Sequence, residues 1–194
     1  MSMLKQLLYS DLARQAELEG RPVARPSFRG FLRRLLHHRF LPIVLCRVSR
    51  AALLGRIPVL PELLTYLNIV LFGLEVSPRC EIGPGIFFPH PSGTVIGARR
   101  IGSNVSIFQG VTLGAKELDM GFDSRLRPEV GDNVVLGAGS KILGGIHIGD
   151  NVTVGANSVV VDSVEANRTV VGIPARGVSK ARPRNSSVEI AAST

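Results

Sequence analysis

The chain has 194 residues, 45% of them hydrophobic, and a formal net charge of +8 at pH 7, with no Trp and two Tyr. This length suggests one domain, or one domain with an extension, and the core has to be built from aliphatic side chains. Two cysteines, Cys46 and Cys80, are too few for a disulfide framework and lack metal-ligand spacing, so we expect a cytoplasmic protein without a metal.

The positive charge lies outside the middle of the chain. Residues 1–73 carry 11 Lys and Arg against 4 Asp and Glu, residues 74–178 carry 9 against 10, and residues 179–194 carry 3 against 1. Residues 25–56 contain eight Arg and no acid. Such a segment suits a nucleic acid, an anionic membrane surface or an acidic partner. We expect no nucleic acid, because the chain has no recognisable nucleic-acid-binding fold.

The N-terminal region, residues 1–73, is predicted to be helical. Residues 3–19 form a short amphipathic helix, and apolar residues recur at helical spacing from 28 to 54 with a break at Pro42. A third helix follows over residues 61–73, with Pro in its first turn and Gly at its end. The sequence therefore places a helical region before the central part of the chain.

None of these helices is expected to cross a membrane or to act as a secretory signal. The longest weakly charged run, residues 57–74, has two Pro and one Glu in its first third, whereas a spanning helix needs about 20 mostly apolar residues. We expect the helices to pack on one another, on the end of the following domain or on a neighbouring subunit. The alternative is that the Arg-rich helix within residues 25–56 lies flat on an anionic membrane.

Residues 74–178 repeat with a period of six. Aliphatic side chains lead each repeat, and Gly, Asn and Asp follow them. The leading residues are Val76, Ile82, Phe88, Val95, Ile101, Ile107, Leu113, Val130, Leu136, Ile142, Ile148, Val154 and Val160. A period of six fits neither a helix nor an ordinary strand, but it fits a solenoid with three short faces to a coil. The leading side chains should point inward, and the Gly, Asn and Asp residues should take the corners, where positive φ is tolerated.

The period fails at two places, and function in repeat scaffolds gathers at such places. One extra residue falls in the segment PHPSGT beside His90. A charged, off-register insert, AKELDMGFDSRLRPE, separates Leu113 from Val130 and is predicted to leave the coil as a loop.

The motifs carry a family resemblance. GLEVSPRCEIGPGIFFPHPSGTVIG, IGSNVSIFQGVTLG, RPEVGDNVVLGAGSKILGGIHIGDNVTVGANSVV and VVGIPAR occur in the order and spacing of serine acetyltransferases and their relatives. The chain therefore resembles the hexapeptide-repeat acyltransferases, which implies a left-handed parallel β-helix over residues 74–178 and an N-terminal α-helical extension. It also implies an acetyl-CoA-dependent O-acetyltransferase, a homotrimer or dimer of trimers, and active sites in clefts between neighbouring solenoids.

The resemblance places a general base at His90. An alcohol attacks a thioester poorly unless its proton is removed, and an imidazole of near-neutral pKa suits that task. Glu75 matches the position of the family's Asp, which orients the imidazole. The alternative is that His90 is a surface residue at an irregular corner.

Two departures from the family bear on the acceptor. The family's Asp-His pair reads Pro89-His90, which removes the carboxylate that would hold a substrate ammonium, and its Arg-His-Pro reads Leu126-Arg127-Pro128. An unpaired ammonium in a cleft is costly. We therefore predict a saccharide hydroxyl, as in an exopolysaccharide precursor. Arg127 either binds its phosphate or uronate or is a solvated residue of the loop. The alternatives are serine O-acetylation for cysteine biosynthesis and a non-catalytic hexapeptide scaffold.

For the coenzyme, the resemblance points to backbone groups at Gly114, Ala138 and Ala156, where small residues let the pantetheine arm lie along the coils. Arg176 and Lys180 are candidates for its phosphates, or they are ordinary basic residues of a C-terminal cap. His147 is expected on the surface. The polar tail, residues 179–194, is expected to be disordered.

Overall fold

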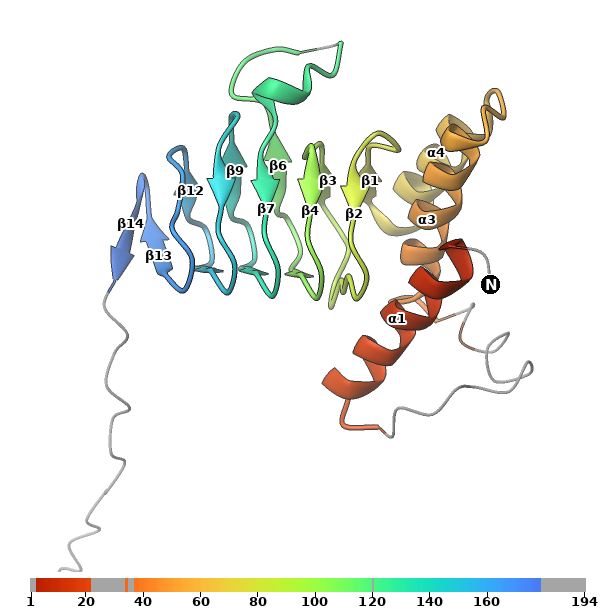
Figure 1. Cartoon of the computed structure of the whole chain (residues 1–194), viewed down its shortest axis with the longest axis horizontal. Coiled ribbons are helices and arrows are strands. Elements are labelled where there is room, and N and C mark those ends of the chain that lie inside the picture. Colours follow the sequence, from red (N-terminus) through yellow and green to blue (C-terminus); the bar gives the residue numbers. More distant parts are fainter. Residues whose placement is uncertain (1–2, 22–33, 35–36, 120, 179–194) are drawn as a thin grey trace, which may run out of the picture.

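The computed structural model describes residues 3–21, 34, 37–119 and 121–178, in which helices are followed by a column of short strands (Figure 1). The helices are α1 (Met3–Leu18), α3 (Leu41–Leu54) and α4 (Leu60–Phe72). Pro stands in the first turn of α3 and α4, where its missing N–H breaks no helical hydrogen bond. All three helices lie at the end of the column that begins with β1 and β2 (Figure 1).

Fourteen short strands follow within the described residues. They are β1 (Leu74–Val76), β2 (Glu81–Ile82), β3 (Thr94–Ile96), β4 (Arg100–Ile101), β5 (Ser106–Ile107), β6 (Thr112–Gly114), β7 (Glu129–Val130), β8 (Val135–Leu136), β9 (Lys141–Leu143), β10 (His147–Ile148), β11 (Thr153–Val154), β12 (Val159–Val160), β13 (Thr169–Gly172) and β14 (Ala175–Val178). A short 3-10 helix, η1 (Ser124–Leu126), lies in the predicted insert.

The strands form three sheets with the orders β1-β3-β6-β9-β12, β10-β7-β4-β2 and β14-β13-β11-β8-β5. Neighbouring strands are parallel, except that β13 and β14 are antiparallel. From β4 to β12, successive strands along the chain move from one sheet to the next, so each of these coils contributes to all three faces of the column. The six-residue period therefore folds as a three-sided parallel β-helix.

The core is an aliphatic column, as predicted. The leading residues from Val130 to Val160 are all buried, together with Ile101, Ile107 and Leu113. One expected position is wrong: Ile96, not Val95, points into the core, and the Val95 side chain is 38% exposed on the outer face. Ile96 pairs with Val76 in β1 and with Leu113 in β6, so the segment between Phe88 and β3 holds two residues more than the period of six, and the step from Ile96 to Ile101 holds one fewer.

Two Arg residues of the basic segment are used inside the fold. Arg47 of α3 is buried and donates Nε–H and Nη2–H to the carboxylate of Asp11 in α1, each at 2.9 Å. Nη1 of Arg50 donates to the carbonyl oxygens of Pro78 and Arg79. These two cations are therefore not free for an anionic surface, and most of the expected Arg-rich helix lies outside the described residues.

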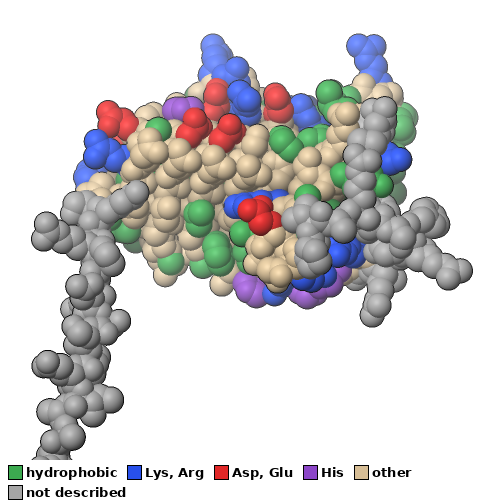
Figure 2. Space-filling view, turned by 60° about the horizontal axis from the view of Figure 1, so that its bottom comes forward, with side chains coloured by type: hydrophobic (Ala, Val, Ile, Leu, Met, Phe, Trp, Pro, Cys, Tyr) green, Lys and Arg blue, Asp and Glu red, His purple; other side chains and the backbone are tan. Residues whose placement is uncertain are grey.

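The β-helix itself carries mixed charges. Acidic and basic side chains lie close together along one edge of the molecule in Figure 2, in keeping with the near neutrality of residues 74–178. The tail expected to be disordered, residues 179–194, lies outside the described residues. Within the part of the chain that the structure does describe, no helix is both long and apolar enough to span a membrane.

Candidate active site

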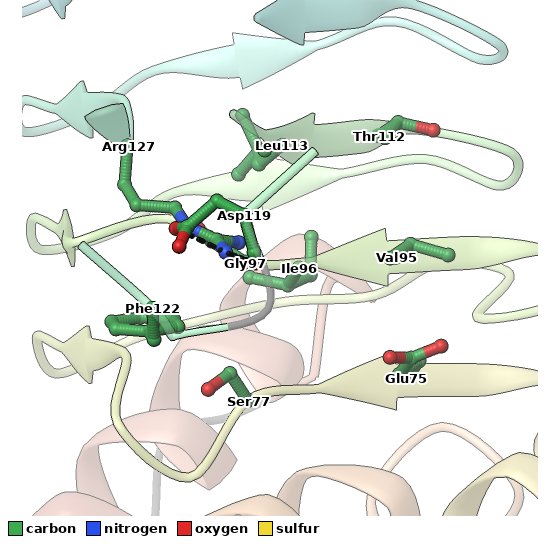
Figure 3. A pocket seen from close by; sticks show the side chains of 11 residues that line it. Glu75, Ser77, Val95, Ile96, Gly97, Thr112, Leu113, Asp119, Phe122 and Arg127 are labelled. Carbon is green, nitrogen blue, oxygen red and sulfur yellow. Dashed lines mark hydrogen bonds and ion pairs between the residues drawn. The ribbon is translucent and has the colours of Figure 1, made fainter. Parts of the chain in front are cut away.

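Glu75 stands at the middle of β1 and points away from the core, because its neighbours Leu74 and Val76 are the buried residues of that strand. It pairs with Val95 of β3, which pairs in turn with Thr112 of β6. These three residues form a ladder on the outer face of the sheet. The ladder is one wall of a groove of about 310 Å³ (Figure 3).

The insert closes the other side of this groove. Its lining includes Asp119, Phe122 and Arg127, which Figure 3 shows facing the strand residues Ile96, Gly97 and Leu113. The insert therefore leaves the coil as predicted, and it folds back over the outer face of the sheet.

Arg127 holds the insert in place. Its Nε–H and Nη2–H donate to Oδ2 of Asp119 at 3.0 and 2.7 Å, and Nη2–H also donates to the Asp119 carbonyl oxygen at 2.9 Å. Nη1–H donates to the carbonyl oxygen of Gly97 at 3.3 Å, and the guanidinium lies 4.6 Å from the centre of the Phe122 ring. A Cβ atom at residue 97 would stand 2.6 Å from Nη1, so glycine leaves room for this contact.

The Arg127 hydrogen bonds lower the pKa of Asp119 below its usual value, so this carboxylate is ionised at neutral pH. Its charge cancels that of Arg127 in the groove. The Glu75 carboxylate has no hydrogen bond or ion pair with any residue of the described chain. Of the three charged side chains that line the groove, two are acidic and one is basic, which leaves an excess negative charge on the Glu75 side.

His90 lies in the exposed turn between the first two coils, after the buried Phe88. Gly93, in the same turn, donates its N–H to the carbonyl oxygen of Gly73 at 2.9 Å, which ties the turn to the residue just before β1. The turn and the start of the Glu75 strand are therefore adjacent. The imidazole does not line the groove, and no hydrogen bond joins it to Glu75 within the described chain.

The comparisons with known proteins agree with this fold. The model of the family "Bacterial transferase hexapeptide (six repeats)" matches residues 127–162. The serine acetyltransferase of Synechococcus elongatus is 42% identical over 161 residues, which is 82% of this chain and 65% of that protein. The serine acetyltransferase of Staphylococcus xylosus is 46% identical over 123 residues, which is 63% of this chain and 56% of that protein.

Two solved serine acetyltransferase structures are similar to this chain over a larger share of its length. A truncated serine acetyltransferase apoenzyme is 31% identical with a TM-score of 0.78, covering 90% of this chain and 70% of that one. The soybean serine acetyltransferase apoenzyme is 34% identical with a TM-score of 0.77, covering 90% of this chain and 69% of that one. The chain belongs to the serine acetyltransferase-like hexapeptide-repeat acyltransferases. Its column is the left-handed parallel β-helix of that family.

The chain spans less than two thirds of the length of either of the two curated relatives given above. Both of these relatives carry the name serine acetyltransferase, and this finding overturns the predicted saccharide acceptor. The reasoning from Pro89 and Arg127 failed for a physical reason. It rested on the carboxylate that is missing at Pro89, but the carboxylates of Glu75 and Asp119 line the groove. The Arg127 that it offered to a phosphate or uronate is paired with Asp119.

The small residues expected along the family's coenzyme lie in three successive coils of the column. Gly114 ends β6 and lines the groove. Ala138 and Ala156 stand in successive corners, where the N–H of Asn157 donates to the carbonyl oxygen of Ala138 at 2.8 Å. Arg176 lies on β14, and its Nη1 is 3.6 Å from the carboxylate of Asp162. Lys180 lies outside the described residues, so its expected contact with a phosphate stays a prediction.

Sequence reasoning missed Asp119 and Phe122. Their only signal was the polar, charged character of the insert, which predicts a loop but not where the loop folds back. His147 lies on the exposed side of β10, as expected.

Proposed function

We propose that the chain is an acetyl-CoA-dependent serine O-acetyltransferase. The observation that carries this proposal is the 42% identity to a serine acetyltransferase over 161 residues, which include Glu75, His90 and the insert. Relatives of the same fold have been solved in complex with CoA and with serine. The negative excess in the groove supports a substrate with an ammonium group, because opposite charge stabilises it there.

The reaction needs two proton transfers, one to His90 and one from it. The serine hydroxyl oxygen attacks the thioester carbonyl carbon, and His90 accepts the hydroxyl proton as the C–O bond forms. The C–S bond then breaks, and the imidazolium returns the proton to the departing thiolate. A correctly placed general base contributes about 10²–10⁴-fold to such a reaction. Glu75, on the strand beside the His90 turn, stabilises the imidazolium through its carboxylate.

Arg127 shapes the acceptor end of the groove. The coenzyme lies along the backbone at Gly114, Ala138 and Ala156. Its phosphates bind Arg176 and Lys180. The exposed position of His90 and the open groove support a homotrimer, or a dimer of trimers, in which a neighbouring column covers the site.

The two free thiols, Cys46 and Cys80, support a reducing cytoplasm. Contact of residues 25–56 with an anionic membrane is a secondary proposal, which rests on their excess of Arg.

The test is thiol release from acetyl-CoA by the purified chain, with L-serine compared against a saccharide acceptor. We expect release with serine and a loss of about 10²–10⁴-fold in kcat for His90→Ala. His147→Ala is the matched control, because His147 is an exposed imidazole outside the groove, and its kcat should not change. Equal rates for His90→Ala and the native chain would instead favour a different base or a non-catalytic scaffold.

A further inference from the structure

The far end of the insert is tied to the first coil by Arg79. This residue stands in the corner between β1 and β2, and its Nη1–H donates to the carbonyl oxygen of Gly121 at 3.0 Å. The insert leaves the column between β6 and β7, two coils further along the chain. Gly97, which accepts from Arg127, belongs to the coil between them. The insert therefore reaches back across a whole coil, and Arg79 holds it at the end of that reach.

The ring of Phe122 contacts both of the arginines that hold the insert. The guanidinium carbon of Arg79 lies 5.8 Å from the centre of the ring, and that of Arg127 lies 4.6 Å from it. A guanidinium group within about 6 Å of an aromatic ring is attracted to the face of the ring. Because the two arginines come from different coils, the position of the ring depends on both ends of the insert being held.

The backbone of Phe122 is strained. Its φ is 59°, in the left-handed region that a bulky side chain rarely adopts. The Asp119 carboxylate accepts from the backbone N–H groups on either side, those of Gly121 at 3.1 Å and Asp123 at 2.8 Å. A residue keeps such a conformation only where its surroundings hold it there, and strained residues gather at functional sites. The contacts of the insert therefore fix where the Phe122 ring lies.

The Phe122 ring is part of the wall of the groove. In Figure 3, Glu75 and Phe122 lie towards opposite ends of the groove, with Ser77 between them. The Glu75 end is next to the His90 turn, where the proposed acetyl transfer takes place. An acceptor whose hydroxyl group reacts at that end has to fit between the reacting atoms and the ring. The ring therefore limits the length of the acceptor.

We propose that Arg79 is a positioning residue of the acceptor site: it holds the insert on the first coil and so places the Phe122 ring as the end wall of the groove. This inference rests on the proposed serine acetyltransferase activity. Arg79 is not among the described residues that line the groove, so it acts through Phe122. The native chain should prefer L-serine to L-homoserine, an acceptor that is one methylene longer.

The first test is thiol release from acetyl-CoA with each of these two acceptors. Phe122→Ala removes the wall and should raise kcat/KM for homoserine relative to serine by about 10-fold or more, because one methylene in a pocket changes this ratio by about 10–200-fold. Arg79→Gln should change the ratio in the same direction but by less, since Arg127 still contacts the ring. The double variant should have the ratio of Phe122→Ala alone, because Arg79 acts through the ring.

The matched control is Arg100→Gln. Arg100 is an exposed arginine of β4 outside the groove, so its variant should keep the native ratio. Arg79→Lys should restore part of the native ratio, because lysine keeps the charge and a hydrogen-bond donor but not the planar guanidinium. An unchanged ratio in Phe122→Ala would overturn the proposal. So would effects of the two substitutions that add in the double variant, or equal losses with both acceptors in Arg79→Gln.

The second test needs no reaction. Hydrogen exchange of residues 115–128, measured by mass spectrometry, should be several-fold faster in Arg79→Gln than in the native chain and in Arg100→Gln. Equal exchange in all three would show that Arg79 does not hold the insert and would overturn the proposal. If the native chain acetylates neither acceptor, the proposed function fails. Faster exchange in Arg79→Gln would then still support the role of Arg79 in placing the insert.

Discussion

Arg127 uses all three of its side-chain nitrogens inside the fold, on Asp119 and on the backbone of Gly97. The pair is largely buried, with the side chain of Asp119 8% exposed and that of Arg127 13% exposed. Such a guanidinium is held rigidly and acts first on the shape of the insert. Its direct contact with an acceptor stays a prediction.

Asp119→Asn should loosen the insert, because the substitution removes the charge that holds Arg127. We expect several-fold lower hydrogen-exchange protection over residues 115–128 at pH 7. In the native chain the pKa of Asp119 is lowered by Arg127, so its stabilising effect is present above the ordinary value of 3.8 and is lost as the pH falls through the lowered folded pKa. Protection should therefore hold from pH 7 to about 4 and decrease below it.

The control for this prediction is Asp123→Asn. Asp123 pairs with Arg125, whose side chain is highly exposed and screened by solvent, so this variant should have the smaller effect on the insert. Equal protection of the insert in Asp119→Asn and the native chain would show that the Asp119–Arg127 pair does not hold it.

At the scale of the elements, one corner of the β-helix is a ladder of asparagines. Asn104, Asn133, Asn151 and Asn167 all have positive φ, between 57° and 63°. Their side-chain amides donate from one coil to the next at 3.3, 3.3 and 3.0 Å. Asn tolerates the left-handed conformation that this corner needs, and its amide both donates and accepts. The residue type that makes the turn also joins the coils.

Asn151→Ala should therefore destabilise the chain by about 1–2 kcal/mol, since alanine is strained at positive φ and ends the ladder in the middle. Asn151→Gly should lose less, because glycine adopts positive φ without strain. Urea unfolding gives both free energies. A loss as large for glycine as for alanine would mean that backbone strain is not the cause.

At the scale of the whole molecule, one buried ion pair joins the helices to the β-helix. Asp11 of α1 accepts from Arg47 of α3 and from the backbone N–H groups of Gly85 and Ile86, at 2.8 and 3.0 Å. Arg47 in turn donates to the carbonyl oxygens of Ile82 and Gly83. The pair thus holds both sides of the corner that leads to Phe88 and His90.

Asp11→Ala leaves the Arg47 guanidinium buried without its partner, and breaking such a pair costs about 3–5 kcal/mol. We expect this loss in urea unfolding. The exposed pair Arg14–Glu17 on the same helix provides the control, and Glu17→Ala should change stability by less than about 1 kcal/mol. Similar losses in the two variants would show that the buried pair does not join the helices to the column.

The sequence alone determined the three-sided solenoid and its aliphatic core, because a period of six is a local property that every coil repeats, and the family resemblance implied that the solenoid is a β-helix. It also marked the turn at His90 and the insert, since both interrupt that period. The acceptor was predicted wrongly from the carboxylate missing at Pro89, because the carboxylate of Asp119 reaches the groove only where the insert folds back. The sequence marks that insert only as polar.

Only the tertiary structure decided which groups meet across the chain. Asp11 and Gly85 are 74 residues apart, and Ile96 takes the core position expected for Val95 because strand pairing, not counting, sets the register. The hydrogen bond from Arg79 to Gly121 likewise joins residues 42 positions apart. Periodicity predicts what repeats from coil to coil, whereas these contacts occur once each and depend on the packing of the whole chain.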